Sequence, residues 1–216
     1  MDYRFNSEVE IPLRSITLTG DLVVPLKAKA IIVFAHGSGS SRMSPRNQMV
    51  AKLLHQRQYG TLLLDLLSEK EDQQYSNRFD ISLLTKRLIG ATHWLEEQKA
   101  CKNCSLAYFG ASTGAAAALK AAAFLPQIES VISRGGRPDL AIESLSNVEA
   151  PTLLIVGSLD YDVLEKNKEA YTLLHCEKKL EIIEGATHLF EEHGMMKKVA
   201  DVAVQWYQHT LHPILA

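Results

Sequence analysis

The sequence predicts an α/β fold with a mostly parallel central sheet, an antiparallel N-terminal edge and helices on both faces. Short apolar runs alternate with longer amphipathic segments, the pattern that βαβ units produce. Several of the apolar runs are continuous rather than alternating, as expected of strands that are covered on both faces. The chain has 216 residues, of which 46% are hydrophobic, which suits one well-buried core and is short for two. We therefore expect a single domain over residues 1–216.

The apolar runs place the strands. In chain order they are Ser15–Val24, Ala30–Ala35, Thr61–Leu66, Ser105–Gly110, Ser130–Ser133, Thr152–Gly157 and Lys179–Ile183. The segment up to Val24 is expected to form the antiparallel edge, because Glu10–Arg14 resembles a turn that is too short for a parallel crossover.

Between the strands, apolar residues recur at the spacing of amphipathic helices. The expected helices are Met43–Gln58, Asp80–Gln98, Thr113–Leu125, Val163–Leu174 and Met195–Thr210. In the second of these, every third or fourth residue is apolar, which gives one stripe that can face the sheet.

Composition and charge exclude several classes of partner. The formal net charge is −2, and the basic residues are scattered, so we expect no nucleic-acid partner. The N-terminus has no apolar signal segment, and the longest apolar runs are far shorter than the ~18 residues of a membrane span. We therefore expect a cytoplasmic protein with no membrane contact.

Cys101 and Cys104 precede a strand and are expected to be a reduced pair in a surface loop. No metal or cofactor is expected.

The most informative stretch is residues 110–114, which read Gly-Ala-Ser-Thr-Gly between a strand-like run and an alanine-rich helical run. Two glycines around Ser112 allow a sharp turn that exposes the serine Oγ above the sheet edge, as in a nucleophile elbow. A tight structural turn that packs a helix closely on a sheet would have the same five residues. The surrounding sequence has to separate these two interpretations.

A serine nucleophile needs a base within hydrogen-bond reach and a carboxylate that orients the base. His188 follows the last predicted strand and a Gly-Ala-Thr turn, so we assign it as the general base. Asp160 and Asp162 follow the preceding strand, and either could orient the imidazole. Asp160 is nearer the strand end, and Asp162 fits the start of the next helix. All these loops leave the carboxyl ends of parallel strands, the edge where open α/β sheets collect functional groups.

Acyl transfer also requires donors for the oxyanion. The backbone N–H of Thr113 is the first candidate, and the second should come from the glycine-rich loop after the strand Ala30–Ala35, from Ser38 or, failing that, Gly39. That loop could instead hold a phosphate, but it lacks the lysine of a P-loop and the spacing of a dinucleotide-binding loop.

In this order, His36-Gly37, the 110–114 motif, Asp160 and His188 resemble an α/β-hydrolase over Ala30 to the C-terminus. Residues 133–140 and 185–192 look like the small dienelactone hydrolase-like branch, some members of which are fused to a phosphoribosyltransferase domain. The resemblance implies the α/β-hydrolase fold without a lid domain. Dienelactone hydrolases are known for a cysteine nucleophile, so Ser112 favours ester or thioester substrates instead.

The function expected is therefore a serine hydrolase that cleaves a small carboxylic ester through an acyl-enzyme on Ser112. Dienelactone or other lactone hydrolysis, thioester hydrolysis, and a non-catalytic scaffold that binds a small ligand or partner are the alternatives. A lidless site should be open and shallow. Arg134 and Arg137 could then pair with a carboxylate or phosphate of the substrate, or form ion pairs that hold a surface loop. The sequence does not fix the oligomeric state.

Overall fold

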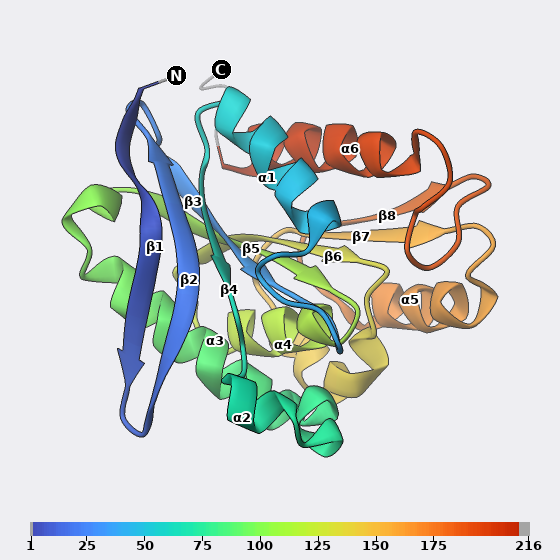
Figure 1. Cartoon of the computed structure of the whole chain (residues 1–216). Coiled ribbons are helices and arrows are strands. Elements are labelled where there is room, and N and C mark those ends of the chain that lie inside the picture. The colour runs from blue at the N-terminus through green and yellow to red at the C-terminus, as the bar shows by residue number, and fades with distance from the viewer. Residues whose placement is uncertain (1, 212–216) are drawn as a thin grey trace.

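A single eight-stranded sheet organises the chain (Figure 1), and the computed structural model describes residues 2–211. The strands lie in the order β1-β2-β4-β3-β5-β6-β7-β8. β1 and β2 are antiparallel, as are β2 and β4, and all other neighbours are parallel. The bounds are β1 Tyr3–Leu13, β2 Ile16–Pro25, β3 Ala30–Ala35, β4 Gly60–Leu64, β5 Ser105–Ala111, β6 Ile128–Arg134, β7 Thr152–Gly157 and β8 Lys178–Ile183. The predicted parallel sheet with an antiparallel N-terminal edge is confirmed.

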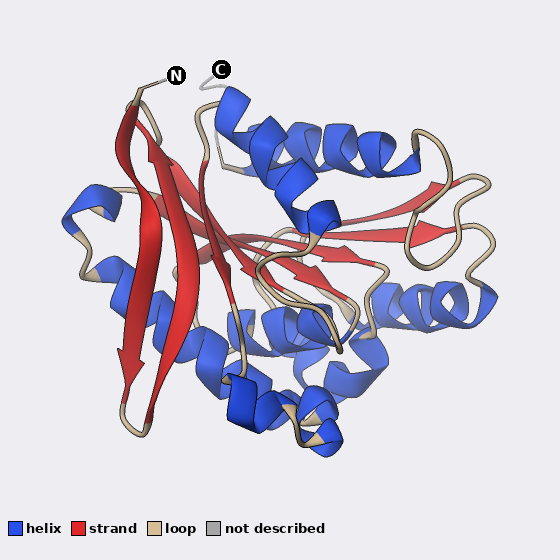
Figure 2. Ribbon diagram, in the orientation of Figure 1, coloured by secondary structure: helices blue, strands red, loops and turns tan. Residues whose placement is uncertain are grey.

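Helices cover both faces of the sheet (Figure 2). α1 (Pro45–Gln56) and α6 (Met195–Thr210) pack together on one face, and α3 (Ile81–Glu96), α4 (Thr113–Ala122) and α5 (Tyr161–Leu173) lie on the other. A short helix α2 (Glu69–Asp72) and the 3₁₀ segments η1 (Tyr75–Phe79), η2 (Lys99–Cys101) and η3 (Pro138–Asn147) complete the described elements. Every residue of β3 is buried, which explains why its sequence is apolar without alternation.

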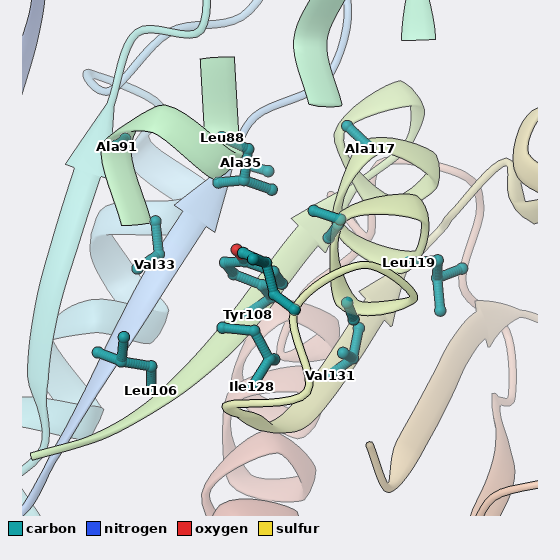
Figure 3. Packing of buried hydrophobic residues seen from close by; sticks show 14 of the residues in the cluster. Val33, Ala35, Leu88, Ala91, Leu106, Tyr108, Ala117, Leu119, Ile128 and Val131 are labelled. Atoms are coloured by element: carbon teal, nitrogen blue, oxygen red, sulfur yellow. The ribbon is translucent and has the colours of Figure 1, made fainter. Parts of the chain in front are cut away.

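The core beneath the elbow is built from small residues of α4 and larger residues of the sheet (Figure 3). Ala117 and Leu119 of α4 belong to the same buried cluster as Tyr108 of β5 and Val131 of β6, and the run of alanines lets this helix lie close to these two strands. Tyr108 is fully buried, and its hydroxyl forms a hydrogen bond of 2.6 Å with the hydroxyl of Thr92 in α3. This packing gives the start of α4 a rigid base.

Two local predictions were wrong. The turn between the first strands is not Glu10–Arg14, because β1 continues to Leu13 and the turn is Arg14-Ser15. Pro12 pairs with Thr17, and a proline is tolerated there because β1 is an edge strand that needs no N–H on its outer side. Cys101 does not lie on the surface: it is 5% exposed, and burial raises the pKa of its thiol to about 12.

Within residues 2–211, no helix combines the length and apolar character that crossing a bilayer requires. Over the same range, no three His, Cys, Asp or Glu side chains gather as a metal-binding group.

Candidate active site

Ser112 sits in a strained backbone conformation between β5 and α4. Its φ is +50° and its ψ is −119°, a region that residues other than glycine rarely enter. The flanking glycines are required by contact: a Cβ on Gly110 would lie 2.4 Å from Ala115 Cα, and one on Gly114 would lie 2.2 Å from the Ala35 carbonyl oxygen. This turn therefore has the geometry of a nucleophile elbow.

His188 and Asp160 form a close hydrogen bond. His188 Nδ1 lies 2.6 Å from Asp160 Oδ2, and the Asp160 side chain is only 13% exposed. Because a carboxylate only accepts, Nδ1 carries the proton, and Nε2 is left free to accept one. Asp160 comes from the loop after β7 and stands at the start of α5, but its side chain does not cap that helix. Asp162 is exposed in the first turn of α5, so of the two candidate aspartates Asp160 is the one paired with His188.

The loop after β6 joins the elbow to the histidine. The Ser112 N–H donates to the Arg134 carbonyl at 3.3 Å, and the Arg137 N–H donates to the Ser112 carbonyl at 3.1 Å. Between them, Gly135 has φ +52°, and a Cβ there would lie 3.6 Å from His188 Cε1. The loops that carry Ser112, Asp160 and His188 thus converge at one edge of the sheet.

The glycine-rich loop after β3 lies directly against the elbow. A Cβ on Gly37 would be 3.0 Å from Ser112 Cβ, and Ser38 and Thr113 both line a small cavity of about 10 Å³. The loop is tied down by His36, whose Nε2 accepts the Leu66 N–H at 3.0 Å, so that Nδ1–H donates to the Gly37 carbonyl at 3.0 Å. Burial lowers the pKa of His36, which keeps the ring neutral, as this pair of hydrogen bonds requires.

The two arginines proposed from the sequence have different surroundings. Arg137 forms a two-hydrogen-bond ion pair with Asp139, at 2.8 and 2.7 Å. Arg134 is buried, 6% exposed, and its Nη2 donates to Asn47 Oδ1 at 3.2 Å. Burial, with a smaller contribution from the nearby charge of Arg46, lowers the pKa of Arg134 to about 10. Only Arg137 therefore has the ion pair expected of a loop-holding arginine.

The loop that carries His188 is held by residues that the sequence did not single out. Thr187 donates from its N–H and its hydroxyl to Glu192 Oε1, at 3.1 and 2.5 Å. These hydrogen bonds lower the pKa of Glu192. Arg46, in the first turn of α1, pairs with Glu191 at 2.8 Å and so links that helix to the same loop. The contact between Thr187 and Glu192 could have been expected from the sequence, because the two residues lie close together on either side of His188. Nothing in the sequence pointed to Arg46.

Sheet order, elbow and converging loops together define an α/β-hydrolase fold, and comparison with solved structures agrees. A structure named dienelactone hydrolase from Anabaena variabilis is 47% identical, has a TM-score of 0.92, and aligns over 95% of this chain and 98% of that one. The chain belongs to the dienelactone hydrolase-like branch of the α/β-hydrolase superfamily. An esterase of Pyrococcus furiosus (16% identity, TM-score 0.82, 95% of this chain and 91% of that one) shares the fold. So does Est1E of Butyrivibrio proteoclasticus (14% identity, TM-score 0.78, 93% and 98%).

Comparison with curated proteins finds longer relatives. Two strains of Mycobacterium tuberculosis contain a protein named "putative phosphoribosyl transferase" that is 49% identical over 203 residues. The match covers 94% of this chain but only 46% of theirs, so the chain spans less than half the length of these relatives. No protein-family model matches the chain.

Proposed function

We propose that this chain is a serine hydrolase that cleaves a small carboxylic ester through an acyl-enzyme on Ser112. The observation that carries the proposal is the 2.6 Å hydrogen bond between His188 and Asp160, formed by loops that converge on the strained Ser112. Serine, carboxylate and histidine also follow one another along the chain in the order that this fold uses.

In the proposed reaction, the Ser112 Oγ bonds to the acyl carbon while its proton passes to His188 Nε2. Asp160 holds the imidazole in the required tautomer and stabilises the imidazolium that forms. The N–H groups of Thr113 and Ser38 donate to the oxyanion. When the tetrahedral intermediate collapses, the ester C–O bond breaks and His188 gives its proton to the leaving alcohol. Water, deprotonated by His188, then attacks the acyl-enzyme and releases the acid and free Ser112.

The short connection from β6 to η3 supports a small or protruding acyl group, because Gly135 to Arg137 are all that separates these elements and no cap domain is inserted there. Lactone hydrolysis is the second candidate, supported by the 47% identical protein named dienelactone hydrolase. A lactone ester bond would pass through the same steps, with the alcohol remaining attached to the acyl part. Thioesters would react in the same way with a thiol as the leaving group.

A fluorophosphonate probe tests the proposal directly, because it labels only an activated serine. Wild-type protein should be labelled and lose esterase activity, and Ser112→Ala should be neither labelled nor active while keeping the wild-type melting temperature. Folded wild-type protein that resists the probe would exclude the serine mechanism and favour the non-catalytic scaffold. A screen of short p-nitrophenyl esters, thioesters and lactones then separates the substrate classes.

A further inference from the structure

Cys101 and Cys104 are the first and last residues of a tight turn that leads into β5. The Cys104 N–H donates to the Cys101 carbonyl at 3.0 Å. Between them, Lys102 has φ −56° and ψ 133°, and Asn103 has φ +62°. These angles define a type II turn, in which the first and last Cα atoms are less than about 7 Å apart. A disulfide bond needs a Cα separation of about 4.4–6.8 Å, so the turn already holds the two cysteines near that spacing.

Cys104 has the surroundings of a reactive thiol. Its side chain is half-buried, and its Sγ–H donates to the Ala28 carbonyl at 3.5 Å. Nη2 of Arg4, on the edge strand β1, lies 3.6 Å from the same sulfur. Reactive cysteines typically lie in partly exposed, electropositive surroundings, whereas fully buried cysteines are inert. Of the two thiols, Cys104 is therefore the one suited to react first with a molecule from solution.

Cys101 is suited to a second step within the protein. Burial, with a smaller contribution from the Cys104 thiol, raises the pKa of Cys101 to about 12, although the charge of Arg4 acts in the opposite direction. Cys101 is thus a poor nucleophile toward a dissolved reagent. Toward the sulfur of Cys104 the reaction is intramolecular, and this proximity offsets the small thiolate fraction.

A small molecule can approach both thiols. Cys101 and Cys104 line the same surface hollow of about 270 Å³, whose walls come from the end of α3, the turn itself and the start of β6. The hollow lies at the end of β5 opposite to Ser112, because the turn precedes that strand and Ser112 follows it. Chemistry at the two cysteines is therefore separate from chemistry at the serine.

We propose that Cys101 and Cys104 form a thiol–disulfide exchange site, which reduces a small-molecule disulfide and is itself converted into a reversible intramolecular disulfide. With glutathione disulfide, the Cys104 thiolate attacks one sulfur, the S–S bond of the oxidant breaks, and one glutathione leaves as a thiolate and takes up a proton. The Cys101 thiolate then attacks Cys104 Sγ, and the second glutathione leaves and is protonated. Two cysteine thiols are oxidised, and one disulfide is reduced to two thiols.

Mass spectrometry of the native protein after incubation with excess glutathione disulfide tests the exchange site. Trypsin cleaves after Lys99, Lys102 and Lys120, so the two cysteines fall in separate peptides, and Cys176 is read independently. After alkylation of the remaining thiols, residues 100–102 should be found joined to residues 103–120 by a disulfide. Excess dithiothreitol should return both peptides to the reduced form. A pair that stays reduced, or that keeps glutathione on Cys104, would overturn the proposal.

Substitutions assign the two steps. Cys101→Ser should stop after the first step, with glutathione retained on Cys104. Cys104→Ser should leave Cys101 reduced over the time in which the wild-type pair is oxidised. Cys176→Ser is the matched control and should form the disulfide at the wild-type rate. If Cys101→Ser does not fold, Cys104→Ser still decides, since glutathione added to Cys101 at the wild-type rate would overturn the order of attack and the proposal with it.

Ser112→Ala should form the disulfide as wild type does, because the exchange does not involve the serine. Failure of the exchange site would leave the proposed hydrolase intact, and failure of the hydrolase would leave the exchange site intact. A disulfide that forms only when Ser112 is present would overturn the separate site.

Discussion

Replacing Asp160 with asparagine should abolish most of the proposed activity without unfolding the protein. The carboxylate is 13% exposed and lies 2.6 Å from His188 Nδ1, so it faces the imidazolium with little water between them. Two unit charges about 4 Å apart attract by about 4 kcal/mol at an effective dielectric constant near 20. Losing that attraction in the transition state slows the reaction by roughly a thousandfold. If the amide NH₂ turns toward Nδ1, the ring takes the tautomer that cannot accept the serine proton, which extends the loss to about 10⁴.

The assay is kcat for p-nitrophenyl acetate in wild type, Asp160→Asn and Asp162→Asn, with thermal melting of all three proteins. Asp162 is the matched control, because it is an exposed aspartate two residues further along the chain. Its loss should change the rate less than about twofold and alter stability by only the ~0.3–1 kcal/mol of a helix-dipole interaction. An Asp160→Asn protein that keeps more than a tenth of the wild-type rate, or equal losses in the two variants, would refute the assignment.

Three further predictions concern the scaffold. Gly114→Ala should destabilise the protein by about 2–3 kcal/mol or more in urea unfolding, because the new Cβ meets the Ala35 carbonyl, and an unchanged midpoint would contradict the tight approach of α4. Burial lowers the pKa of His55 from 6.5 to about 4, so as the pH falls the unfolded chain takes up a proton at this residue before the folded chain does. The neutral His55 therefore contributes to the free energy of unfolding fully above pH 6.5, and this contribution is lost as the pH falls toward 4. From pH 7.5 to 4.5 the melting temperature should therefore decline less in His55→Gln than in wild type. Equal declines would show that His55 does not cause the loss of stability at low pH. Under native conditions a thiol reagent should modify Cys101 last of the three cysteines, as followed by mass spectrometry, and equal rates would show that its burial is transient.

The positions of the site loops could be predicted because the buried parallel strands are apolar along their whole length. The residues that end β5, β7 and β8 were therefore identified to within one or two positions, and Ser112, Asp160 and His188 follow them. The early turn was misplaced because Pro12 resembles a turn residue, and only the edge position of β1 makes it compatible with a strand.

Other features depend on contacts between distant residues. The choice between Asp160 and Asp162 required the structure, because their spacing along the chain is almost equivalent. The surroundings of Arg134 also required the structure, because its place at a strand end is visible in the sequence, whereas its burial and its hydrogen bond to Asn47 of α1 are not. The segment that forms α2 and η1 was not predicted, since it is polar and has no period.

The strand order also divides the sequence cleanly. The first four strands form one side of the sheet and the last four form the other, and the two sets meet only where β3 pairs with β5. The first set carries Ser38, one of the two proposed oxyanion donors, and the second carries Ser112, Asp160, His188 and the other donor, Thr113. A chain divided in the exposed turn at residues 102–103 would yield a C-terminal fragment with the nucleophile and an N-terminal fragment with the oxyanion donor of the loop after β3. Activity would then report reassociation of the two fragments, and a slip of one residue between β3 and β5 would abolish it.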